Sequence, residues 1–185
     1  MYGLTVLLAI PLGKYIANVF QPESANGPAE RFIYRIGGID PTREMSWKEN
    51  LVALLTINAV WLIIAFTLLM LQGILPLNPD GNPSMTPDLA FNTASSFMVN
   101  CDLQHYSGES GVTYLTQLFV MNFLMFVSAA TGIASLLLIV RSFLPNVVTT
   151  VGNFYVFFVK AITRILLPVS FVVALLLVFN GTPAS

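Results

Sequence analysis

Charged residues and cysteine are scarce in this chain. Only 9% of its 185 residues are Asp, Glu, Lys or Arg and 56% are hydrophobic, whereas soluble domains carry roughly 25% charged residues. This composition excludes a soluble enzyme. With one cysteine, Cys101, and one histidine, His105, the sequence offers no internal disulfide, Cys/His metal cluster or nucleophile–histidine pair. A net charge of -1 without a basic patch argues against nucleic acid as a partner.

Positive charge is confined to two stretches of the sequence. All eight basic residues lie between Lys14 and Lys48 or between Arg141 and Arg164, and the 92 residues from Glu49 to Val140 contain none. Basic residues gather on the cytoplasmic side of integral membrane proteins. We therefore expect both stretches inside and residues 73–111 outside.

Long uncharged runs indicate membrane-spanning helices. Leu51–Gln72 has 22 such residues and Val112–Val140 has 29, and each run is long enough to cross a bilayer. A last helix has the apolar part Ile165–Phe179, which Pro168 interrupts. Residues 1–20 are expected to form an additional transmembrane helix with its N-terminus outside, and Lys14 reaches back to the interface.

Residues 21–48 alone have soluble character, and we expect them to lie at the cytoplasmic interface. Pro28 is placed to begin a short helix, and Gly37-Gly38 is placed to end it. Ser46 and Glu49 have the spacing of a capping box at the start of the first long run. These signals predict where the neighbouring helices begin and end.

Between the two long runs lies a segment too polar to span a membrane and too apolar for an ordinary loop. Pro87–Met98 predicts roughly 18 Å of helix, about half a bilayer. Asn100–Gly111 returns as irregular chain, in which Gly108 and Gly111 are expected to permit φ > 0. Such a half-length helix directs the negative end of its dipole inward, where the carbonyls that follow can replace the water shell of a cation. The alternative is an amphipathic helix lying on the outer surface.

Four stretches of the sequence carry a family resemblance: DPTREMSWKENL, LPLNPDG, DLAFNTASSFMVNCDLQHYSGESG and NFLMFVSAATGIASLLLIVRSF. Together they resemble the potassium-transporting ATPase A subunit family, the ion-selecting subunits of Kdp complexes. The resemblance implies an all-α integral membrane fold. Its core is one membrane-pore-membrane, potassium-channel-like repeat with a re-entrant pore helix. An extra transmembrane helix precedes this repeat, and the first helix of a second repeat follows it.

The resemblance divides the chain into four parts. They are the extra helix (1–20), the cytoplasmic interfacial segment (21–48), the first repeat (49–142) and the first helix of the second repeat (143–185). Within the first repeat, the pore helix is expected at about 87–98 and the filter loop at about 99–105.

The resemblance also implies the potassium-binding residues. Val99, Asn100 and Cys101 fall in the filter strip of the first repeat, Asp102 continues it, and Gln104 matches the glutamine just above it. The sequence expected in the family is Thr-Asn-Thr-Asn-Trp-Gln, where this chain has Val-Asn-Cys-Asp-Leu-Gln. Backbone carbonyls tolerate these changes, but the carboxylate of Asp102 is expected to alter the outer mouth of the path.

The function implied is that of a potassium-binding and potassium-translocating subunit, represented by its N-terminal part. The system would be ATP-driven, high-affinity potassium uptake across the bacterial cytoplasmic membrane. Potassium would be the ion, without an organic cofactor. The partners would be a catalytic ATPase subunit, small accessory subunits and membrane lipid. ATP hydrolysis would occur on a partner, because this sequence has no phosphate-cradling loop.

The sequence leaves two points open. Lys160 and Arg164, one turn apart near the inner end of the last helix, are expected to be interfacial anchors or contacts for the ATPase subunit. The chain as a whole has two alternative interpretations. One is a structural membrane subunit that never contacts ions, and the other is a secondary transporter with a re-entrant hairpin, which predicts inverted repeats.

Overall fold

A computed structural model describes residues 2–21, 24–104, 106–143 and 150–182, with the side chains of 2, 4 and 109 left out. The parts of the expected segments that fall on residues 1, 22–23, 105, 144–149 and 183–185 lie outside this description. The described residues form helices and connecting segments without a named strand; Met45 and Gly152 form an isolated β-bridge. The expectation of an all-helical chain is confirmed for this part of the sequence.

Three helical stretches within the described residues have the length and apolar composition to cross a membrane. The first, Trp47–Ile74, consists of α3 (Trp47–Leu71) and the turn η1 (Gln72–Ile74). The second, Tyr114–Ser142, consists of α6 (Tyr114–Thr116), the π-helical η2 (Gln117–Asn122) and α7 (Phe123–Ser142). The third, Phe154–Phe179, consists of α8 (Phe154–Lys160), the π-helical η3 (Ala161–Leu166) and α9 (Leu167–Phe179). The N-terminal α1 (Tyr2–Val19) contributes only a shorter apolar stretch from Thr5 to Val19. Its role as a membrane span stays a prediction.

Three short helices complete the described chain. They are α2 (Pro28–Gly37), α4 (Pro87–Met98) and α5 (Gly108–Gly111). The local signals for α2 and α3 are confirmed. Gly38 follows α2 in the left-handed conformation, and Ser46 and Glu49 form a capping box at α3. The left-handed residue ends α2 because the chain cannot continue as a right-handed helix through it.

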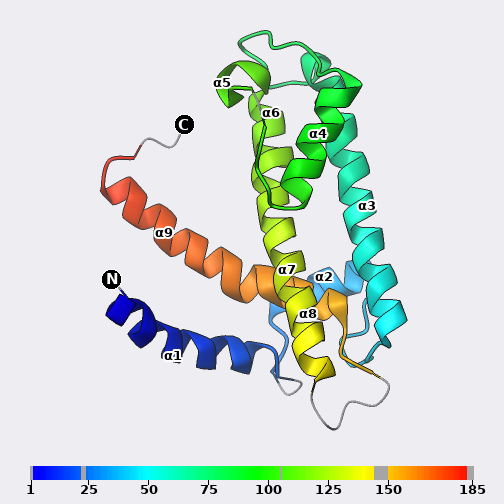
Figure 1. The fold of residues 1–185 in the computed structure, drawn as a ribbon, viewed down its shortest axis with the longest axis vertical. Helices are drawn as coiled ribbons and strands as arrows, with labels where there is room; N and C mark the ends of the chain where they lie inside the picture. The colour runs from blue at the N-terminus through cyan, green and yellow to red at the C-terminus, as the bar shows by residue number, and fades with distance from the viewer. Residues whose placement is uncertain (1, 22–23, 105, 144–149, 183–185) are drawn as a thin grey trace.

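The half-length helix α4 packs between α3 and α7. Figure 1 shows α3 and α7 side by side along the long axis, with α4 between them at the end that carries α5 and α6, which we call the loop end. Ala90 and Ala94, one turn apart on α4, are fully buried in a cluster with Leu69 of α3 and Leu124 of α7. These small side chains allow α4 to approach both neighbours closely. The chain after α4 returns to the loop end, where α5 lies.

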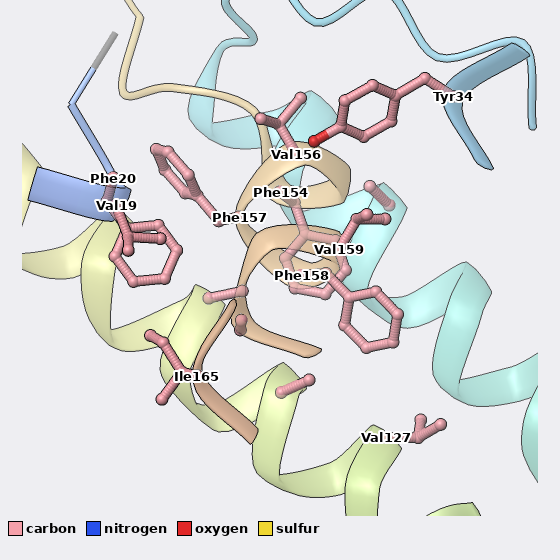
Figure 2. Packing of buried hydrophobic residues seen from close by; sticks show 14 residues of the cluster. Val19, Phe20, Tyr34, Val127, Phe154, Val156, Phe157, Phe158, Val159 and Ile165 are labelled. Atoms are coloured by element: carbon pink, nitrogen blue, oxygen red, sulfur yellow. The ribbon is translucent and has the colours of Figure 1, made fainter. Parts of the chain in front are cut away.

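The other end of the molecule, which holds α2 and α8, contains the larger apolar core; we call it the basic end. Figure 2 shows the aromatic side chains of α8 surrounded by α1, α3 and α7. Phe154 is fully buried, and Phe157 meets Phe20 edge to face at 5.9 Å between ring centroids. This aromatic packing joins the end of α1 to the start of the last long helix.

Two asparagine side chains fix where the last long helix begins. The Asn50 side-chain oxygen on α3 accepts a hydrogen bond from the Phe154 backbone N–H at 2.7 Å, and its nitrogen donates to the Gly152 carbonyl at 3.2 Å. Asn153 caps α8 by accepting from the N–H groups of Tyr155 and Val156. Both asparagines are buried. They satisfy backbone groups that would otherwise be buried without partners.

A buried ion pair joins α2 to the π-helical segment η3. The Glu30 carboxylate, 3% exposed, accepts hydrogen bonds from the Arg164 guanidinium and from the Thr163 hydroxyl. Burial by itself raises the pKa of Glu30, but the hydrogen bonds from Arg164, the Gly27 N–H and Thr163 together hold it below its ordinary value. Lys160, also buried, donates to the Ser24 carbonyl at 3.3 Å. Lys160 and Arg164, expected to be anchors or partner contacts, therefore have partners within this chain.

A second contact between α1 and the last long helix lies one turn before Pro168. Proline has no N–H to donate to the carbonyl four residues earlier, which here belongs to Arg164. The Tyr15 hydroxyl of α1 donates to that carbonyl at 2.8 Å. The position of α1 is thus tied to the break in the last helix.

Candidate functional site

The segment after α4 has an unusual backbone. Asn100 has a φ of 55° and Asp102 a φ of 53°, both in the left-handed region, while Val99 has a φ of -96°. Among the described residues other than glycine, only Leu77 shares this property. Asn and Asp tolerate the left-handed region better than other side chains do. Residues 99–104, which we call the strip, therefore alternate in handedness instead of running as an extended strand.

The two N–H groups that follow the left-handed residues of the strip both donate to one residue of α4. The Cys101 N–H donates to the Ser96 carbonyl at 2.9 Å, and the Leu103 N–H donates to the Ser96 hydroxyl oxygen at 2.9 Å. The described peptide bonds are trans, and in a trans peptide the C=O points opposite to the N–H that follows it. The carbonyls of Asn100 and Asp102 therefore both point away from Ser96.

These two carbonyl oxygens receive no hydrogen bond from a described residue. A row of backbone carbonyls directed to one side of the chain is the arrangement that can replace the hydration shell of a cation. The preceding α4 adds to this, because the C-terminal end of a helix carries a partial negative charge. The strip is thus electronegative without a fixed charge on its backbone.

The strip lies at the middle level of a spanning helix. The Ser128 hydroxyl donates to the Asn100 side-chain oxygen at 3.4 Å. Ser128 is the fifteenth residue of the 29-residue stretch Tyr114–Ser142, counting from Tyr114. Asn100 therefore sits about halfway along that stretch, at the depth that a half-length helix reaches.

The predicted site residues differ in their surroundings. Val99, Asn100, Cys101 and Asp102 are exposed in this chain, and Val99 reaches 72% exposure. Gln104 is half-buried, and its side-chain oxygen is buried without a hydrogen-bond partner among the described groups. An orphaned amide oxygen is costly unless a ligand, water or another chain meets it. Residue 105 of the expected loop lies outside the described residues.

The expectation for Gly108 and Gly111 is wrong. Both lie in the short helix α5 and neither has a positive φ. A side chain at position 111 would overlap the ring of Tyr106, whose hydroxyl meets the Thr93 hydroxyl of α4 at 3.1 Å. Gly111 thus serves close packing, and the strained backbone belongs to Asn100 and Asp102 instead.

Gln72 holds the loop end together, which sequence reasoning missed. Its side chain is fully buried and donates to the carbonyls of Pro83 and Gly111 at 2.8 and 2.9 Å. Its oxygen accepts from the Thr116 hydroxyl at 3.0 Å. A glutamine at the end of an apolar run looks like a surface residue, and only the return of the chain from α4 brings its partners together.

A cavity of about 330 Å³ at the basic end is a weaker candidate site. Its lining cations are already paired: Arg43 with Glu49, Arg141 with Glu44, and Lys160 with the Ser24 carbonyl. The carbonyls of the strip have no such partners in the described chain. The strip is therefore the stronger candidate for a ligand site.

Three long apolar helices and a half-length helix packed between two of them define the class: an α-helical membrane protein. The family model for the potassium-transporting ATPase A subunit matches residues 1–185, and the chain belongs to this family.

Three relatives are each named potassium-transporting ATPase potassium-binding subunit. That of Flavobacterium johnsoniae is 55% identical over 99% of this chain and 33% of its own length. That of Bacteroides thetaiotaomicron is 54% identical over 98% and 33%. That of Caldanaerobacter subterraneus subsp. tengcongensis is 45% identical over 99% and 33%. The chain spans about a third of the length of these curated relatives.

Proposed function

We propose that the strip lines one side of a potassium path in the complete subunit. In this proposal α4 is a re-entrant pore helix, and residues 49–142 form one membrane-pore-membrane repeat. Residues 1–20 are an extra transmembrane helix, 21–48 an interfacial segment, and 143–185 the first helix of a second repeat. The observation that carries the proposal is the pair of carbonyls of Asn100 and Asp102, directed to the same side at the middle of a spanning stretch.

Potassium enters such a path by exchanging water for protein oxygens. The carbonyls of Asn100 and Asp102 supply two, and the unpartnered side-chain oxygen of Gln104 supplies a third. The remaining oxygens come from outside this segment, because one strip covers one side of an ion. A purely structural subunit has no use for a strained strip with free carbonyls, which favours an ion path over that alternative.

The names of the relatives support a proposal for the wider assembly. They are named potassium-binding subunits of a potassium-transporting ATPase. We propose that the complete subunit here works with a catalytic ATPase subunit and small accessory subunits. ATP hydrolysis would occur on the catalytic partner. The membrane would be the bacterial cytoplasmic membrane, with the basic end inside and the loop end outside.

Substitution of Asn100 tests the proposal through its backbone. A β-branched side chain is strongly disfavoured at φ > 0, whereas glycine is not. Asn100→Val in the complete subunit should raise the KM for potassium uptake about tenfold, as expected for 1–3 kcal/mol of backbone strain. Asn100→Gly should stay closer to the original value. The measurement is potassium uptake at low external concentration in cells that depend on this system.

The matched control is Leu77→Val, because Leu77 has a φ of 62° in the loop between α3 and α4, where its carbonyl accepts a hydrogen bond from the Tyr114 N–H at the loop end. It introduces the same strain without touching the proposed path, so its KM should not change. Equal KM values for Asn100→Val and Leu77→Val would contradict the proposed role of the strip.

A further inference from the structure

We infer that the Ser96 hydroxyl is a positioning group that sets the potassium affinity and selectivity of the strip. This inference rests on the proposed function of the strip as an ion path. Ser96 lies in the last turn of α4, is 8% exposed, and makes the only described side-chain hydrogen bond to a backbone N–H of the strip.

The two tethers from Ser96 are separable by mutation. The Cys101 N–H is held by the backbone carbonyl of Ser96, which every residue at this position retains. The Leu103 N–H is held by the Ser96 hydroxyl oxygen alone among the described groups. Removal of the hydroxyl therefore frees the peptide between Asp102 and Leu103 and leaves the peptide between Asn100 and Cys101 in place.

A freed peptide changes the ion path in a specific way. The tether keeps the Leu103 N–H turned toward α4 and the Asp102 carbonyl turned away from it. Without the tether, the peptide rotates and presents the positive end of its dipole where the carbonyl stood. Alanine at position 96 offers the Leu103 N–H no acceptor in place of the Ser96 hydroxyl oxygen.

Selectivity depends on the number and field strength of the coordinating carbonyls. Loss of one oriented carbonyl should weaken potassium binding and reduce the preference for potassium over rubidium and sodium. The maximal rate should change little, because the path itself stays open. A merely structural serine would instead change the amount of folded complex and leave the ion preference intact.

The experiment uses the complete subunit assembled with its partners, in cells that depend on it for potassium. Ser96→Ala should raise the KM for potassium uptake about 2- to 10-fold, the loss of affinity expected for one hydrogen bond. It should also reduce the preference for potassium over rubidium. Ser96→Thr keeps a hydroxyl at the same carbon and should restore both quantities. Ser95→Ala is the control, because the half-buried Ser95 has no described hydrogen bond from its hydroxyl to the strip.

Three outcomes decide the inference. The inference is supported if Ser96→Ala raises the KM for potassium and reduces the preference for potassium over rubidium, while Ser96→Thr and Ser95→Ala leave both quantities unchanged. An unchanged KM and preference in Ser96→Ala, with Asn100→Val still impaired, overturns the role of Ser96 and leaves the ion path standing. Unchanged uptake in both Ser96→Ala and Asn100→Val overturns the ion path itself.

Discussion

Gln104→Arg should weaken potassium uptake by the complete subunit roughly 100-fold or more. The Gln104 side-chain oxygen is buried and has no hydrogen-bond partner among the described groups, and in the proposal above it is one of the oxygens that meet the ion. An arginine there adds a permanent positive charge where a cation sheds its water. Two unit charges about 4 Å apart repel by about 4 kcal/mol at an effective dielectric constant of 20, close to a thousandfold in affinity.

The measurement is the concentration dependence of potassium uptake, with Ile74→Arg as the control. Ile74 is 80% exposed in the turn after α3. An arginine at this position places the same charge at the loop end, outside the strip. Ile74→Arg should retain near-normal affinity. Unchanged potassium affinity and flux in Gln104→Arg would rule out a filter role for Gln104.

Glu30→Gln should strongly destabilise the basic end. It keeps the size of the side chain but leaves the Arg164 guanidinium, 23% exposed, without its carboxylate. Removal of one partner from a buried ion pair costs about 3–5 kcal/mol. Thermal unfolding of the detergent-solubilised complete subunit measures the loss as a lower midpoint temperature.

Glu44→Gln is the matched control for that experiment. The side chain of Glu44 is 49% exposed and pairs with Arg141 at 3.4 Å, so its loss should cost less than about 1 kcal/mol. Equal destabilisation by Glu30→Gln and Glu44→Gln would show that the Glu30–Arg164 pair does not hold α2 to the last helix.

Acid should weaken the same contact. The folded state holds the pKa of Glu30 below its ordinary value of 4.5. The stabilisation is therefore fully present above pH 4.5 and is lost as the pH falls below 4.5 through the lowered pKa. Glu30→Gln should remove this part of the pH dependence, while Glu44→Gln should retain it.

Local signals in the sequence predicted the ends of several helices well. Ser46 and Glu49 mark the start of α3, and Gly38 follows α2, because a cap and a left-handed residue act on backbone groups a few positions away. The half-length helix α4 also covers the range in which a helix was expected. Its role as a pore helix rests on tertiary structure and stays a prediction.

Contacts between distant residues could not be predicted in this way. Glu30 and Arg164 are 134 residues apart, and Asn50 and Phe154 are 104 apart. Nothing in the neighbourhood of these residues specifies a partner, so Arg164 was expected to be an interfacial anchor or a contact for the ATPase subunit. The strip shows the same limit: family resemblance made Asn100 and Gln104 candidate site residues, but the tethers to Ser96 depend on how the chain turns after α4.

Cys101 offers a direct test of whether potassium occupies the strip. Cys101 is exposed and is the only cysteine of these 185 residues. The measurement is its labelling rate with a membrane-impermeant thiol reagent added outside, in a complete subunit whose other cysteines have been replaced. Ser84→Cys, at an exposed position of the loop end, is the control in a Cys101→Ser background.

Potassium should slow the labelling of Cys101 at concentrations that saturate uptake, and sodium at the same concentrations should not. The Ser84→Cys thiol should be labelled by the external reagent at the same rate in potassium and in sodium. A Cys101 labelling rate that is the same in potassium and sodium would contradict occupancy of the strip by potassium. Labelling of Ser84→Cys only after the membrane is opened would contradict the proposed orientation.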